Sequence, residues 1–140
     1  MTITTTPHLN FRGQARPALE FYKTVFGGQM MMATHAQPYP DAPAAESDLI
    51  AFGQVESEAG FRIMAYDVPA SRPYEPGIAP IFVSVRGTDT DEISRYWSGL
   101  AEGASIIQPL APSGWAPLYG MLTDRFGVTW VLDVAAPYQA

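Results

Sequence analysis

Apolar and polar residues alternate in short runs along this chain, and the runs recur in the same order in two halves. In the first half, a run ending at the Arg-Gly pair 12–13 precedes a segment of helical period with an aromatic pair at 21–22. In the second half, a run ending at the Arg-Gly pair 86–87 precedes a helical segment with an aromatic pair at 96–97. Alternation predicts half-buried strands and a period near 3.6 predicts an amphipathic helix. Each half therefore begins with a strand and continues into a helix.

Three further strand-like runs follow each predicted helix, and turns rich in Gly or Pro separate them. They cover residues 29–36, 48–55 and 61–68 in the first half, and 105–110, 118–124 and 128–134 in the second. A strand, a helix and three strands, found twice, predict an α+β fold built from a duplicated βαβββ module. We expect one domain over residues 1–140, with module 1 at about 7–68 and module 2 at about 80–134.

Alternation also predicts which side chains of the opening strands face away from the helix. Leu9 and Phe11 form the apolar set of the first strand, so their neighbours face the other way. The residues expected on that other side are His8, Asn10, Arg12, Phe82, Ser84 and Arg86. Near the end of the chain, the alternation of Val128, Trp130 and Leu132 predicts that Trp130 packs in the core.

Polar residues at strand ends and turns have structural explanations of their own. Asp124 begins the turn of residues 124–127 and is expected to accept backbone N–H groups there. Thr88 to Asp91 offer capping oxygens at the start of the second helix. His35 ends a predicted strand beside a loop, and we expect it at the surface.

Composition and charge narrow the classes of partner. With 140 residues, the chain is long enough for a real core. A formal net charge of −6, with eight Lys and Arg residues and no basic run, predicts neither nucleic-acid binding nor attraction to an anionic membrane. Cysteine is absent, which excludes disulfides and thiolate ligands. We expect no signal peptide and no membrane-spanning helix, and therefore a cytoplasmic protein.

Two motifs resemble a known superfamily. The stretch FRGQARPALEFYKTVFGG and the later pattern PL....W...YG...DRFGV.W at residues 109–130 are similar to the vicinal oxygen chelate group of glyoxalases, bleomycin-resistance proteins and dioxygenases. Within it, the chain most resembles the PhnB-like branch. The resemblance implies two βαβββ modules forming a cup-shaped, eight-stranded mixed sheet around a pocket, and a homodimer.

Metal enzymes of that superfamily take their ligands from four inward positions. The resemblance maps two of these positions to His8 and Phe82, and it places the other two near Ile50 and Val131. Only His8 can coordinate a metal, and catalytic zinc usually has three protein ligands. A displaced set drawn from His8, His35 and either Asp48 or Glu46 is the alternative. We expect no catalytic metal and no other cofactor, with a displaced divalent ion left open.

The leading hypothesis is a protein that binds a small organic molecule in the cup. Two alternatives remain: a metal-dependent lyase or dioxygenase with displaced ligands, and a resistance-type protein that sequesters a drug. Ligand pockets are mostly apolar with a few placed polar groups. The residues predicted to line this one are His8, Asn10, Arg62, Met64, Ser84, Arg86, Trp115 and Tyr119.

Overall fold

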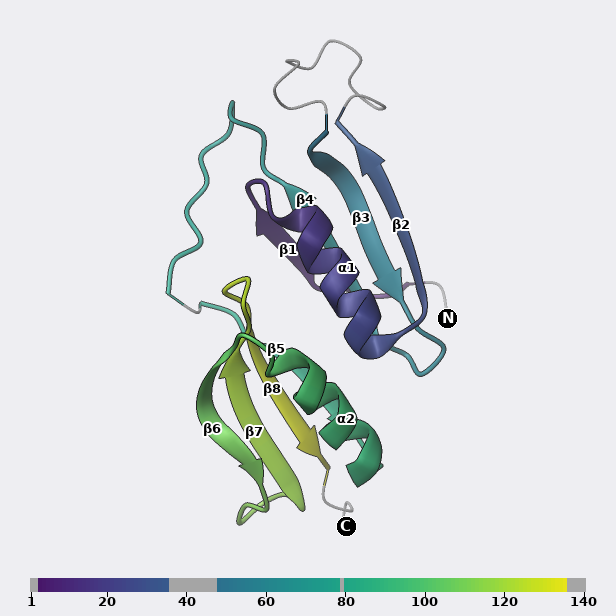
Figure 1. Cartoon of the computed structure of the whole chain (residues 1–140), viewed down its shortest axis with the longest axis vertical. Coiled ribbons are helices and arrows are strands. Elements are labelled where there is room, and N and C mark those ends of the chain that lie inside the picture. The colour runs from purple at the N-terminus through teal and green to yellow at the C-terminus, as the bar shows by residue number, and fades with distance from the viewer. Residues whose placement is uncertain (1–2, 36–47, 79, 136–140) are drawn as a thin grey trace. The chain divides into compact units, whose positions relative to one another are not determined.

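The computed structural model describes residues 3–35, 48–78 and 80–135, and these residues form eight strands and two helices (Figure 1). In chain order they are β1 (His8–Phe11), α1 (Ala15–Phe26), β2 (Gln29–Thr34), β3 (Ile50–Glu56), β4 (Arg62–Asp67), β5 (Val83–Gly87), α2 (Thr90–Leu100), β6 (Ser105–Ala111), β7 (Leu118–Thr123) and β8 (Thr129–Val134). The predicted order of one strand, one helix and three strands in each half is confirmed.

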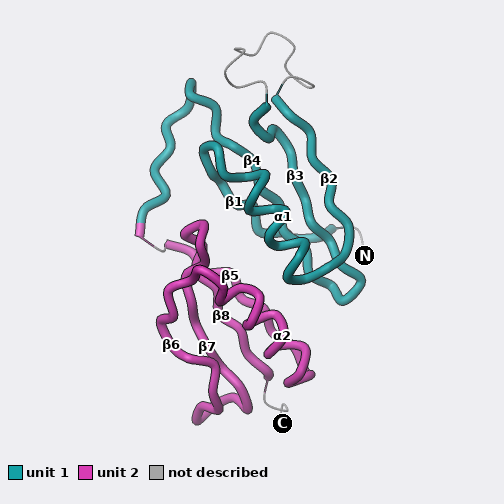
Figure 2. Tube along the Cα trace, viewed as in Figure 1, with its two compact units in different colours: residues 1–77 teal, residues 78–140 magenta. Residues whose placement is uncertain are grey.

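The chain divides into two compact units, residues 1–77 and 78–140, and each predicted module lies within one unit (Figure 2). Each unit contains one four-stranded sheet, with strand order β1-β4-β3-β2 in module 1 and β5-β8-β7-β6 in module 2. The first strand of each module pairs in parallel with the last, and the remaining pairs are antiparallel. The α+β fold class with two βαβββ modules is therefore confirmed. That the two modules act as a single domain stays a prediction.

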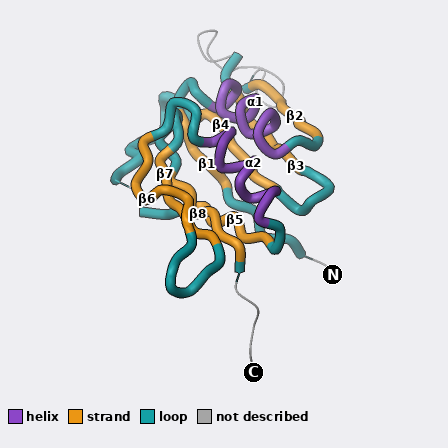
Figure 3. Tube along the Cα trace, turned by 60° about the horizontal axis from the view of Figure 1, so that its bottom comes forward, coloured by secondary structure: helices purple, strands orange, loops and turns teal. Residues whose placement is uncertain are grey.

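Each helix covers one face of the sheet in its own module (Figure 3). Helix α1 packs on β2, β3 and β4, while α2 packs on β5 and β8. The largest fully buried apolar side chains lie in these helix–sheet cores, and they are Leu19, Tyr22, Ile50, Val55, Ile63, Ile93, Leu100, Leu122, Trp130 and Leu132. The predicted core position of Trp130 is confirmed. The opposite side of each sheet is called the helix-free face below.

A glycine lets each helix approach the third strand of its module. The Leu19 side chain of α1 occupies the space where a Cβ on Gly53 of β3 would lie. Likewise, a Cβ on Gly120 of β7 would lie 2.8 Å from the Trp97 ring of α2 and 3.0 Å from the Leu110 Cα. A Cβ at either position would force a neighbour to shift, and the shift is harder at Gly120, where the neighbours are an aromatic ring and backbone.

Buried aspartates hold the turns of the fold. The Asp67 carboxylate is 2% exposed and accepts hydrogen bonds from the backbone N–H groups of Gly13 (2.7 Å), Ala15 (3.1 Å) and Ile50 (2.9 Å). It thus satisfies donors at the start of α1, where no local side chain does so. In module 2, Asp89 performs this task locally by accepting from Asp91 N–H at 2.9 Å, as expected for the 88–91 segment.

The turn between β7 and β8 agrees with its predicted structural role. The Asp124 carboxylate accepts the backbone N–H groups of Phe126 (2.8 Å) and Val128 (3.0 Å). It also accepts the indole N–H of Trp130 at 2.9 Å. Gly127 closes the turn with φ +89°, a left-handed conformation that favours glycine.

The expected surface position of His35 is wrong. Its side chain is buried, and the ring Nε2 lies 3.0 Å from the backbone oxygen of Asp67. The His35 backbone N–H also donates to the carbonyl of Leu49 at 2.8 Å. The prediction took the neighbouring loop as a sign of exposure. In the structure, His35 instead connects the end of β2 to the start of β3 and the end of β4, which buries its side chain.

Candidate functional site

The eight predicted site residues fall into two groups of four, one in each module. The strand residues among them lie on the helix-free faces, as the pairing registers and the burial pattern show. Those of module 1 are His8, Asn10, Arg62 and Met64, and those of module 2 are Ser84, Arg86, Trp115 and Tyr119.

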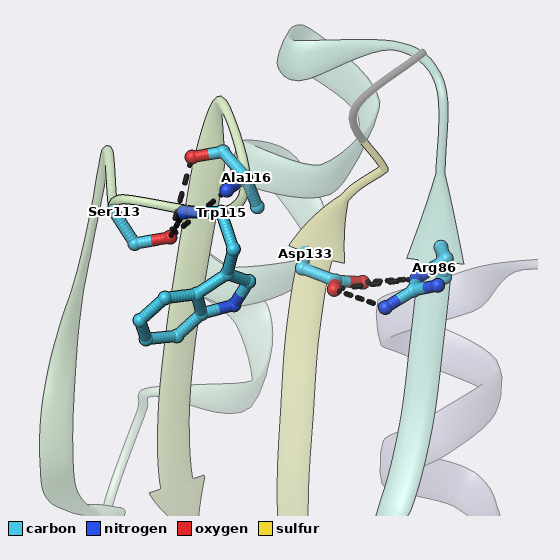
Figure 4. Close-up of polar contacts among 5 residues, drawn as sticks. All are labelled: Arg86, Ser113, Trp115, Ala116 and Asp133. Carbon is cyan, nitrogen blue, oxygen red and sulfur yellow. Dashed lines mark hydrogen bonds and ion pairs between the residues drawn. The ribbon is translucent and has the colours of Figure 1, made fainter. Parts of the chain in front are cut away.

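In module 2, an ion pair crosses between the two parallel strands of the sheet. Arg86 of β5 donates from Nε to the Asp133 carboxylate of β8 at 3.1 and 3.3 Å, and from Nη2 at 2.9 Å (Figure 4). The two residues are direct neighbours in register, and both point to the helix-free face. Such a two-pronged contact orients a guanidinium firmly.

The two partners of this pair differ sharply in exposure. The Asp133 side chain is 4% exposed, whereas the Arg86 side chain is 64% exposed. The hydrogen bonds and the charge of Asp133 raise the pKa of Arg86, so the guanidinium stays charged. Among the contacts of the described residues, none uses Nη1 of Arg86. An oriented cation therefore presents N–H donors outward.

An exposed aromatic pair lies on the same module. Trp115 precedes β7 and is 64% exposed, and its ring meets the Tyr119 ring edge to face at a centroid distance of 5.1 Å. Ser113 shapes this loop, because its Oγ accepts the N–H groups of Trp115 (3.4 Å) and Ala116 (3.1 Å). Figure 4 shows the indole beside the sheet at about the level of the Arg86–Asp133 pair.

The strand register relates the aromatic pair to the ion pair. Arg86, Asp133 and Tyr119 are direct neighbours on β5, β8 and β7, so they form one row across the sheet. Neighbouring strands lie about 4.8 Å apart, which places the Cα atoms of Arg86 and Tyr119 about 10 Å apart. The row combines a guanidinium, a carboxylate and a phenol, and the Trp115 indole lies against the phenol ring. Aromatic side chains with a few placed polar groups are typical of a small-molecule site.

The helix-free face of module 1 has a different polar network. His8 Nδ1 lies 3.0 Å from Asn10 Oδ1, and the imidazole meets the Tyr66 ring edge to face at 5.2 Å. Arg62 forms an ion pair with Glu56 at 3.0 Å, and its buried Nε has no hydrogen-bond partner among the described residues. Apart from the Arg62 Nε, the polar groups of this face bond to one another.

Arg12 does not behave as its repeat position predicts. We expected it to point inward like Arg86, but its guanidinium donates to the carbonyls of Val68 and Pro69 at 3.4 and 3.3 Å and to that of Arg72. It also lies 5.3 Å from the centre of the Tyr74 ring. Arg12 therefore anchors the segment that follows β4.

The positions that resemble metal-ligand sites do not fit a metal. Ile50 is fully buried on the helix side of its sheet, so its assignment to the inward set is wrong. The residue of module 1 that is equivalent to Val131 is Tyr66. Val131 pairs with Ser84 and Tyr66 pairs with Asn10, and both partners lie two residues before the arginine of the Arg-Gly pair in their module. Together with His8 and Phe82, this set contains one imidazole and no carboxylate, which suits neither zinc nor iron.

The displaced ligand set does not come together either. His8 lies on edge strand β1, whereas the buried His35 follows β2 at the opposite edge of the sheet. Within residues 3–35, 48–78 and 80–135, no three His, Asp or Glu side chains group as a metal site would require. Glu46 lies outside the described residues. The absence of a catalytic metal stays a prediction.

Asp133 and Tyr66, which take part in the polar and ring contacts of these faces, were not among the predicted site residues. Asp133 looked like an ordinary strand-end carboxylate, and Tyr66 could not be assigned to a face. The signal for Asp133 was present in the alternation, because Trp130 and Leu132 belong to the core and Asp133 must face the other way. The parallel pairing of β5 with β8, which places it beside Arg86, required the structure.

Neither helix that the structure describes is long and apolar enough to cross a membrane.

Comparison with known proteins gives the family. The model of the family described as 3-demethylubiquinone-9 3-methyltransferase matches residues 3–132. The solved structure of protein PA1353 from Pseudomonas aeruginosa is 34% identical, with a TM-score of 0.82, and the match covers 96% of this chain and 98% of that one.

Two more distant structures share the fold. A putative 3-demethylubiquinone-9 3-methyltransferase, a PhnB protein from Bacillus cereus, is 22% identical with a TM-score of 0.69 over 95% of this chain and 100% of that one. A glyoxylase/bleomycin resistance protein/dioxygenase domain from Frankia sp. EAN1pec is 10% identical with a TM-score of 0.67 over 97% and 99%. The chain shares the fold of both structures, and the family model shows that it belongs to the family described as 3-demethylubiquinone-9 3-methyltransferase.

Proposed function

We propose that this protein binds a small organic molecule on the helix-free faces of its sheets, without a catalytic metal. The observation that carries the proposal is the row of Arg86, Asp133 and Tyr119 with Trp115 beside it. A large exposed ring and an oriented cation each suit a ligand. Aromatic surface supplies contact area, and a placed N–H donor supplies orientation.

The metal-free part of the proposal rests on the chemistry of the available side chains. The inward positions offer one imidazole, that of His8, together with Tyr66 in module 1 and Phe82 and Val131 in module 2, none of which supplies a second imidazole or a carboxylate. The Nε2 of His35 lies 3.0 Å from the backbone oxygen of Asp67. A metal-dependent lyase or dioxygenase with displaced ligands is the competing function. Metal analysis of the purified protein separates the two, and we expect less than stoichiometric zinc, iron, nickel and manganese. A near-stoichiometric metal that is lost in His8→Ala would contradict the proposal.

Binding itself is tested by a thermal-shift screen with charged and uncharged, aromatic and aliphatic small molecules. A ligand that binds the native state raises the melting temperature by an amount that grows with the ratio of its concentration to its Kd. We expect hits among aromatic compounds, and we expect Arg86→Gln to lose them while Arg125→Gln keeps them. Arg125 is the matched control because it is an arginine of the same module that lies in the turn after β7. Its guanidinium donates to the backbone carbonyl of Glu102 and not to the Arg86–Asp133 row. A screen without hits, or equal losses in both variants, would contradict binding at this face.

Mass spectrometry of the incubated hits distinguishes an enzyme from a binder. A ligand recovered unchanged supports binding without chemistry, including the sequestering role of a resistance-type protein. A new product formed by the metal-free protein would show that this face also carries catalysis.

We also propose that the protein is a homodimer. Strand β6 is an edge of its sheet, and it exposes Ile106 and Ile107. Exposed apolar edge strands favour pairing with another chain. Light scattering after gel filtration is expected to give twice the chain mass, and Ile107→Lys is expected to lower it. A monomer in the unmodified protein would contradict the dimer.

A cytoplasmic location completes the proposal. Cell fractionation is expected to recover the protein with cytoplasmic markers, and recovery from a secreted or membrane fraction would contradict this location.

A further inference from the structure

We propose that the module 2 face selects an uncharged aromatic compound with an acceptor oxygen, such as an aryl carbonyl or carboxamide, over an aromatic acid. This inference rests on the proposed function, because it names the class of ligand for the same face. Three observations carry it: the charge balance of the face, the unused donors of Arg86, and the position of the aromatic pair.

The face has no net charge. Arg86 and Asp133 carry opposite charges, and their closest N–O distance is 2.9 Å. The other strand residues that the registers place on this face are uncharged, and they are Ser84, Gln108, Ala111, Tyr119, Met121, Thr123, Thr129 and Val131. An anionic ligand would meet the attraction of Arg86 and the repulsion of Asp133 together. It would also have to lose its hydration and approach a chain of net charge −6.

Arg86 nevertheless keeps a role for a neutral acceptor. Asp133 takes the Nε and Nη2 donors, and Nη1 is left outward on a side chain that is 64% exposed. A carbonyl oxygen can accept from Nη1 without bringing a second negative charge to the pair. The hydrogen bond is charge-assisted, which makes it stronger than one between neutral groups.

The aromatic pair lies at a suitable distance for the rest of such a ligand. Tyr119 lies two strands from Arg86 in the same row, about 10 Å between Cα atoms. The Trp115 ring meets it edge to face and exposes much of its surface. A flat ring can stack on Trp115 while its carbonyl oxygen reaches toward Arg86. Ser113 is a positioning residue in this arrangement, because its Oγ holds the backbone N–H of Trp115.

Three probes of nearly equal shape test the inference by isothermal titration calorimetry: 2-naphthamide, 2-naphthoate and 2-methylnaphthalene. We expect 2-naphthamide to bind best. The charged 2-naphthoate is expected to bind about fivefold more weakly because of its desolvation and the repulsion from Asp133. The acceptor-free 2-methylnaphthalene is expected to bind about tenfold more weakly because it forms no hydrogen bond.

Variants assign the effect to the named residues. The double variant Arg86→Gln/Asp133→Asn replaces the ion pair with a neutral pair and so avoids a buried unpaired carboxylate. It is expected to weaken 2-naphthamide about tenfold, with little effect on 2-methylnaphthalene. Trp115→Ala is expected to weaken both about tenfold, and Trp115→Phe to restore most of the affinity. Arg125→Gln is the control, and circular dichroism checks the fold of each variant.

Several results would overturn the inference. They are equal or tighter binding of 2-naphthoate, equal effects of the double variant and Arg125→Gln, and no binding of any probe. The proposed function survives the first result, because a ligand still binds at this face, whereas the second result would also contradict binding at this face. It also survives the third if the thermal-shift screen gives other hits that depend on Arg86. It fails together with the inference if that screen gives no hits.

Discussion

Module 1 and module 2 have the same order of elements, but they use their matching arginines and strand-end aspartates differently. In module 1, Arg12 binds backbone carbonyls and Asp67 binds backbone N–H groups, so both serve the fold. In module 2, Arg86 and Asp133 bind each other on the helix-free face. Duplication of the backbone has therefore not duplicated the side-chain chemistry.

The cause is a shift of one residue in the last strand. Asp67 pairs with Phe11, the residue before Arg12. Asp133 pairs with Arg86, which is the module 2 equivalent of Arg12. Side chains alternate along a strand, so the shift places the two aspartates on opposite faces. Module 2 starts its helix with the local cap of Asp89 instead. Its strand-end aspartate is thereby available to bind Arg86 on the helix-free face.

The largest expected effect on stability comes from Asp67→Ala. This change leaves the buried N–H groups of Gly13, Ala15 and Ile50 without their acceptor. We expect the free energy of unfolding to fall by about 4 kcal/mol, since each buried unsatisfied group costs about 1–3 kcal/mol. Urea denaturation measures it, with Asp133→Ala as the counterpart in module 2. A loss as large in Asp133→Ala would contradict the structural division between the modules.

Gly120→Ala tests the close approach of α2 to β7 and is expected to have the next largest effect. The added Cβ would meet the Trp97 ring and the Leu110 backbone, so the unfolding free energy should fall by about 2 kcal/mol. Gly53→Ala in module 1 should cost less, because its closest contact is the end of the flexible Leu19 side chain. Gly114→Ala is the control, since nothing lies within 4 Å of its added Cβ. Equal stability of the Gly120 and Gly114 variants would contradict this packing.

The smallest effect is expected from Asp89→Ala. The change removes the cap that accepts the Asp91 N–H, which should cost about 1 kcal/mol of unfolding free energy. Asp89→Asn keeps a capping oxygen and should recover most of the loss. A cost matching that of Asp67→Ala would contradict the view that module 2 caps its helix with a weaker, local contact.

The repeating pattern of the sequence predicted the elements well because each is a local property. Alternation and helical period identify strands and helices, and they also placed Trp130 in the core and His8 on the helix-free face. The failures concern residues whose role depends on partners far along the chain. Nothing local shows that Arg12 reaches the carbonyls after β4, or that His35 lies against Asp67.

The candidate site was predictable in its parts but not in its arrangement. Ser84 and Arg86 follow from alternation, and Trp115 and Tyr119 from the loop that they flank. The bond between Arg86 and Asp133 depends on the parallel register of β5 with β8, 47 residues apart. Strand pairing over such a separation is set by the whole fold, so a local pattern does not specify it.

Side-chain NMR during titration with 2-naphthamide tests the central claim that the matching arginines have different roles. The claim predicts that the Arg86 Nε–H and the Trp115 indole N–H resonances shift as the ligand binds. Those of Arg12, which binds carbonyls, and Trp130, which binds Asp124, should stay in place. Shifts at Arg12 as large as those at Arg86, or binding without a shift at Arg86 and Trp115, would contradict the account.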